Sequence, residues 1–122
     1  MANTGQFNVC CSGDLNVDIH RPGLVGLFRG AISADCLQFS MKGIQIETSA
    51  KLFVGEKLIL DLEVHDMRVE ELQGTVRSIS AVEDKHYYDI DFSIGYRKKG
   101  AANTIHCLRH LENHLRHQMA TV

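Results

Sequence analysis

The sequence of 122 residues lacks tryptophan, has a single proline and is nearly balanced in charge. No apolar run approaches the roughly 18 residues of a membrane-spanning helix, so we predict no membrane association. Thirteen Lys and Arg against fifteen Asp and Glu give a net charge of −2, which does not support general nucleic-acid binding. The N-terminus has no basic segment followed by an apolar one, so nothing indicates secretion and we expect a cytoplasmic protein.

Metal-binding and catalytic patterns are also missing. None of the four cysteines has the Cys-x-x-Cys spacing of zinc ribbons and redox motifs, so we predict reduced thiols. No Gly-x-Ser-x-Gly elbow surrounds Ser40, and no nucleophile, base and orienting group can be placed together, so we predict no catalytic residue and no enzyme activity. His106, His110 and His114 recur on the solvent face of a predicted helix without a further ligand, so we predict no metal site and no cofactor.

Most of the sequence alternates apolar and polar residues with the period of two that is typical of half-buried strands. The predicted strands cover, approximately, residues 15–20, 27–39, 44–47, 57–64, 72–82 and 88–94. No helix pattern separates them. Six short strands in succession favour an antiparallel barrel or a sandwich.

The last quarter of the chain changes to a helical period. An apolar stripe recurs there every three or four residues: Ile105, Leu108, Leu111, Leu115 and Met119. This spacing predicts an amphipathic helix over about residues 102–118. The stripe either covers one opening of the predicted barrel or pairs with a second copy or a partner protein, giving a dimer through helix packing. We expect one domain over residues 13–122, preceded by a flexible N-terminus at residues 1–12.

A short polar turn joins two of the predicted strands and contains Gln38, Ser40 and Gly43. Ser40 can cap the amides of the turn or offer its hydroxyl to a ligand. Gly43 supplies a backbone geometry that a β-carbon would resist. These residue types alone are also typical of an ordinary turn between strands.

The order of further motifs after this turn resembles the PilZ domain, a bacterial six-stranded barrel that binds the second messenger cyclic di-GMP. These motifs are Gly55, the Leu58, Leu60 and Leu62 strand, Gly74-x-Val76, Tyr88-Asp89-Ile90-Asp91-Phe92 and the terminal helix. The resemblance runs from Leu15 to the C-terminus and implies a mostly β, six-stranded antiparallel barrel with a C-terminal α-helix. In this family an Asp/Asn-x-Ser-x-x-Gly motif contacts the guanine and phosphate groups, which implies ligand-binding roles for Gln38, Ser40 and Gly43.

The second motif of the family, Arg-x-x-x-Arg before the first strand, is missing because no arginine precedes Leu15. Arg21 is the first arginine and is our candidate phosphate contact, and only Arg29 follows it before the turn. Arginine grips phosphate through paired donors and stacks on bases, which lysine does not replace. The resemblance therefore implies a bacterial signalling module that binds cyclic di-GMP weakly or in an altered mode. The alternative is a protein-interaction adaptor that has lost the nucleotide, and both readings imply a protein partner.

Overall fold

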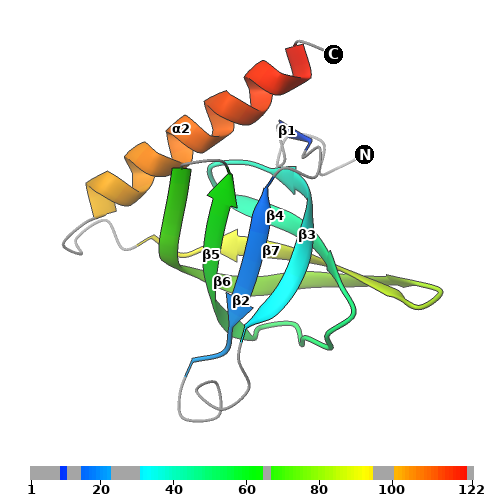
Figure 1. Cartoon of the computed structure of the whole chain (residues 1–122). Helices are drawn as coiled ribbons and strands as arrows, with labels where there is room; N and C mark the ends of the chain where they lie inside the picture. The colour runs from blue at the N-terminus through cyan, green and yellow to red at the C-terminus, as the bar shows by residue number, and fades with distance from the viewer. Residues whose placement is uncertain (1–8, 11–14, 23–30, 65–66, 95–100, 121–122) are drawn as a thin grey trace.

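The computed structural model describes residues 9–10, 15–22, 31–64, 67–94 and 101–120, with side chains described from residue 15 onward and, in the helix, for residues 103–116. Figure 1 shows a barrel of strands with one long helix lying across one end. The elements are β1 (Val9–Cys10), β2 (Asn16–His20), β3 (Ile32–Phe39), β4 (Gly43–Thr48), β5 (Lys57–Val64), β6 (Met67–Val82), β7 (Lys85–Phe92) and α2 (Ala101–Ala120).

Six of these strands form a closed antiparallel barrel. The hydrogen-bonded order is β3-β2-β5-β6-β7-β4, and β4 pairs back with β3 to complete the circle. The short strand β1 pairs with the end of β3. This result confirms the predicted fold class, and it selects the barrel over the sandwich.

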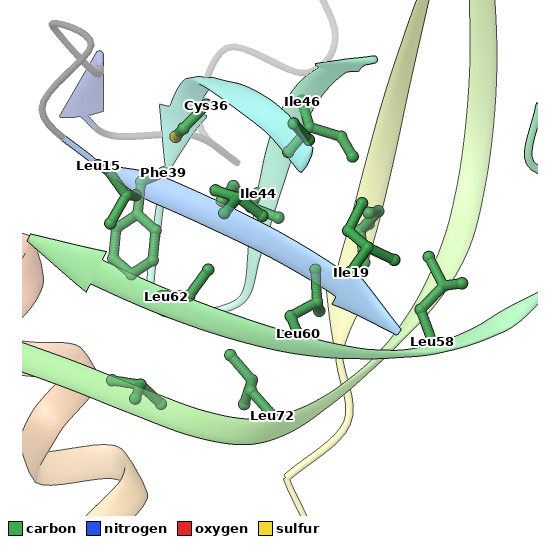
Figure 2. Packing of buried hydrophobic residues seen from close by; sticks show 14 of the residues in the cluster. Leu15, Ile19, Cys36, Phe39, Ile44, Ile46, Leu58, Leu60, Leu62 and Leu72 are labelled. Atoms are coloured by element: carbon green, nitrogen blue, oxygen red, sulfur yellow. The ribbon is translucent and has the colours of Figure 1, made fainter. Parts of the chain in front are cut away.

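The interior of the barrel is filled by the apolar side chains that alternate along each strand. In β5, for example, Leu58, Leu60, Leu62 and Val64 are buried while the residues between them are partly or fully exposed. Figure 2 shows side chains from different strands gathered inside the barrel, among them Ile19, Phe39, Ile44, Leu60 and Leu72.

The helix α2 completes the core. Leu108, Leu111 and Leu115 are 0%, 2% and 1% exposed and belong to the same buried cluster as the strand residues. The apolar stripe therefore packs against the chain's own barrel. This arrangement is the first of the two alternatives predicted from the sequence. No helix in the described residues is long and apolar enough to span a bilayer.

Strand β6 begins earlier than the sequence pattern predicts, at Met67 rather than near Leu72. Leu60 pairs with Leu72 and Leu62 with Val69, so a bulge inserts one extra residue into β6. Glu71 has a φ of 56° at this bulge, and its backbone N–H donates to Asp61 Oδ1 at 2.9 Å. The bulge interrupts the period of two, which explains why the pattern concealed the first part of the strand.

The prediction of four reduced cysteines is wrong for Cys36, which is disulfide-bonded, whereas Cys107 is a free thiol. Its partner lies outside the described side chains. The pairing of β1 with β3 brings Val9–Cys10 alongside β3. The spacing of the cysteines in the sequence did not predict this contact. Most of the predicted flexible N-terminus, residues 1–12, lies outside the described residues, and within it Val9–Cys10 form β1.

Candidate functional site

The turn between β3 and β4 uses the hydroxyl of Ser40 internally. Ser40 is 2% exposed, and its Oγ accepts the backbone N–H groups of Lys42 at 3.1 Å and Gly43 at 3.2 Å. The Ser40 backbone N–H donates to the Gly43 carbonyl at 2.9 Å. The side chain thus caps the turn, which is the first of the two roles that its residue type allows.

We predict that Ser40→Ala lowers the free energy of unfolding by about 1 kcal/mol, because the buried amide of Gly43 and the partly buried amide of Lys42 lose their acceptor. Chemical denaturation followed by circular dichroism measures this change. Ser49→Ala, on an exposed serine, is the control and should change stability by less than about 0.5 kcal/mol. Equal effects of the two substitutions would contradict the capping role.

Gly43 is required by the close approach of two strands. It pairs with Asp91 of β7, and a β-carbon built on it would lie 2.4 Å from the backbone carbonyl oxygen of Ile90. Gly43 has no positive φ. The sequence therefore singled out the right residue, but the physical reason is the space beside β7 rather than an unusual turn conformation.

Gln38 lies on the outer surface of the barrel in a row of polar side chains. Because Gln38 pairs with Gln45, and Gln45 with Asp89, these three residues share the outer face. Asp89 is two strands away from Gln38, roughly 10 Å across the sheet. Asp91 follows on the same face of β7, so the surface beside Gln38 carries two carboxylates.

One guanidinium lies among these carboxylates. Arg77 of β6 has Nη2 at 3.6 Å from Asp89 Oδ2 and Nε at 3.5 Å from Asp91 Oδ1. Asp89 also accepts a hydrogen bond of 2.7 Å from the hydroxyl of Ser78. This group has two negative charges and one positive charge, which makes the local surface unfavourable for a phosphate.

Arg21 lies at the opposite end of β3 from Ser40. It follows β2, whose residue Ile19 pairs with Ile32 at the start of β3, whereas Ser40 follows the end of β3. An eight-residue strand separates them by roughly 20–25 Å. The structure therefore brings Gln38, Ser40 and Gly43 together and leaves Arg21 apart from them.

Arg21 already has anionic and carbonyl partners. Its Nε donates to Glu56 Oε2 at 2.7 Å, and its Nη2 donates to the carbonyl of Lys51 at 2.6 Å. These contacts hold the loop between β4 and β5 against the end of β2. Arg29 and the basic residues 97–99 lie outside the described residues.

Sequence reasoning missed the cluster of Arg77, Asp89 and Asp91. Only the strand order β4-β7-β6 shows that these residues lie beside Gln45. On the helix, the rings of His106 and His110 are 4.4 Å apart in an edge-to-face arrangement. Within the described residues no three His, Cys, Asp or Glu side chains form a metal-ligand group.

Comparison with known proteins shows similarity at the level of fold. No family model matches the sequence, and no curated protein matches it. The structure is similar to that of K. pneumonia MrkH in its apo state, with a TM-score of 0.73 and 12% sequence identity. The match covers 97% of this chain and 51% of MrkH, so the chain spans about half the length of that protein. The two proteins share a fold.

Proposed function

We propose that this chain is a non-enzymatic regulatory module of PilZ type, which acts through a protein contact and binds cyclic di-GMP only weakly. The six-stranded barrel with a C-terminal helix supports the family, because it is the fold that the sequence motifs implied. The similarity to MrkH at a TM-score of 0.73 supports the same fold.

The two carboxylates beside Gln38 are the main observation that supports weak binding of cyclic di-GMP. A cyclic dinucleotide with two phosphates, resting on Gln38 and the Ser40 turn, would approach Asp89 and Asp91. Arg77, which could meet a phosphate, is already shared between these two carboxylates. Arg21 is paired with Glu56 at the other end of β3. Like charges close together at a surface of this kind disfavour an anionic ligand.

We predict that calorimetric titration of the wild-type protein with cyclic di-GMP gives a dissociation constant above about 100 µM. The double substitution Asp89→Asn and Asp91→Asn should tighten binding by about tenfold, because it removes two negative charges and frees Arg77 to meet a phosphate.

A matched pair controls for net charge. Glu83→Gln with Asp84→Asn removes the same two charges at the exposed tip of the β6–β7 hairpin and should leave the affinity unchanged within about twofold. Low-micromolar binding by the wild-type protein would contradict the proposal. Equal tightening in both double variants would show that Asp89 and Asp91 have no special role.

A further inference from the structure

The outer part of β6 has a free edge. Pairing of β5 with β6 ends at Lys57 and Thr75, and Val76 then exchanges backbone hydrogen bonds with Gly55 and Glu56. Beyond Val76, β6 pairs only with β7 in the part of the chain that the structure describes. Figure 1 shows this β6–β7 hairpin extending well beyond the barrel.

The backbone groups that face this edge can be identified from the hairpin. Val82 and Lys85 close the two-residue turn, so their backbone groups face each other across the hairpin. Alternation along an antiparallel strand then directs the N–H and C=O groups of Ser80 toward β7 and those of Ile79 and Ala81 toward the free edge. The edge thus offers two donors and two acceptors, one of each on Ile79 and on Ala81, which is the pattern that an antiparallel partner strand needs.

Side chains along the edge do not protect it. Residues 78–82 are all exposed, and none of the five is charged or a proline, the usual devices that block strand pairing. Four large hydrophobic side chains are exposed in the described part of the chain, and all four lie on β6 or in the loop that reaches Val76. They are Phe53 at 59%, Val54 at 63%, Ile79 at 40% and Val82 at 57%. Ile79 and Val82 lie on the outer part of β6 itself, and exposed hydrophobic side chains beside an unpaired strand edge favour an interaction surface.

We propose that the β6 edge pairs with the same edge of a second copy, antiparallel and centred on Ser80. In this register Ile79 lies opposite Ala81 of the second copy, and Ala81 opposite its Ile79, so every free N–H and C=O of these residues finds a partner. The twofold symmetry makes the contact closed, with the same residues used by both chains.

Charge supports a second copy as the occupant. The register centred on Ser80 pairs residues 78–82 of the two copies, between the bulge at Arg77 and the hairpin turn that begins at Glu83. The strand between them, Ser78–Val82, is uncharged, so no like charges meet. The hairpin tip of each copy, with its exposed Val82, then lies near the loop of Phe53 and Val54 of the other, because Val82 lies opposite Ser78 and that loop bonds to Val76 two residues away.

Analytical ultracentrifugation over a concentration series tests the proposal. The wild-type protein should show a concentration-dependent dimer. Ile79→Lys, which places a charge on the edge, should shift the dissociation constant upward by at least tenfold. Asn113→Lys adds the same charge on the exposed face of α2 and should leave the dimer unchanged. A wild-type protein that stays monomeric, or equal dimers in all three proteins, would overturn the proposal. If the protein is monomeric, a strand of a different protein becomes the alternative partner for the β6 edge.

Cysteine substitution tests the register. In a background in which every cysteine outside the Cys36 disulfide is replaced by serine, Ser80→Cys should form an interchain disulfide rapidly, because two Ser80 side chains meet at the twofold axis, about 5 Å apart between their β-carbons. Ser78→Cys should form it at least tenfold more slowly, because each Ser78 lies opposite Val82 of the second copy. Equal rates for the two variants would overturn the register, and with it the proposed pairing.

Discussion

Gly43→Ala is expected to destabilise the protein by about 3 kcal/mol or more and to lower Tm by about 12 °C. The added β-carbon would lie 2.4 Å from the carbonyl oxygen of Ile90, a backbone atom that cannot move without separating β4 from β7. These two strands are neighbours in the closed barrel, so the strain falls on a pairing that the whole fold needs. Thermal and urea denaturation followed by circular dichroism measure the loss.

Gly55→Ala is the control for Gly43→Ala, because it imposes a backbone conformational cost without a steric clash. Gly55 has a φ of 88°, which alanine adopts reluctantly, but nothing lies within 4 Å of the position that a β-carbon would take. We therefore expect Gly55→Ala to cost only about 1 to 2 kcal/mol. If Gly43→Ala cost no more than Gly55→Ala, the close approach of β4 and β7 would not be the reason for the glycine.

Leu108→Ala is the second large effect that we expect, with a loss of about 2 to 5 kcal/mol in the free energy of unfolding. The Leu108 side chain is completely buried in the cluster that the helix shares with the barrel. Removing it leaves a cavity between α2 and the strands, and the cost includes both lost burial and lost packing. Urea denaturation of the purified variant gives the value.

The neighbouring exposed Arg109 provides the matched control on the same turn of α2. Arg109→Ala should change stability by no more than about 0.5 kcal/mol, because alanine favours the helix and no packing is lost. A loss below about 1 kcal/mol for Leu108→Ala would mean that the helix does not contribute to the core of the barrel.

Much of the fold could be predicted from local patterns. Alternation at Leu58, Leu60 and Leu62 gave both the strand and its inward face, and the three-and-four spacing of Leu108, Leu111 and Leu115 gave the helix and its buried side. These patterns are readable because each buried face has a fixed period. The turn at Ser40 was also predicted, since serine and glycine are typical of such turns.

The surroundings of the candidate site could not be predicted, because they depend on which strands become neighbours. Asp89 and Asp91 are more than forty residues from Gln45 and Gly43 in sequence, and β4–β7 pairing brings them together. The same reason hid the role of Tyr88, whose buried hydroxyl donates to the Ala50 carbonyl at 2.8 Å and accepts the Leu52 N–H at 3.0 Å. Single-sequence patterns carry no signal for such contacts.

The closure of the barrel has a consequence for how the chain folds. The hairpins β3–β4, β5–β6 and β6–β7 join strands that are adjacent in sequence, whereas β2 pairs with β5 and β4 with β7 across separations of about 40 to 50 residues. Long loops must be ordered before these two pairings gain contact energy, so we expect them to form late and to slow folding. Until then β2 and β4 each have an unpaired side, and the incomplete sheet is the state most exposed to aggregation.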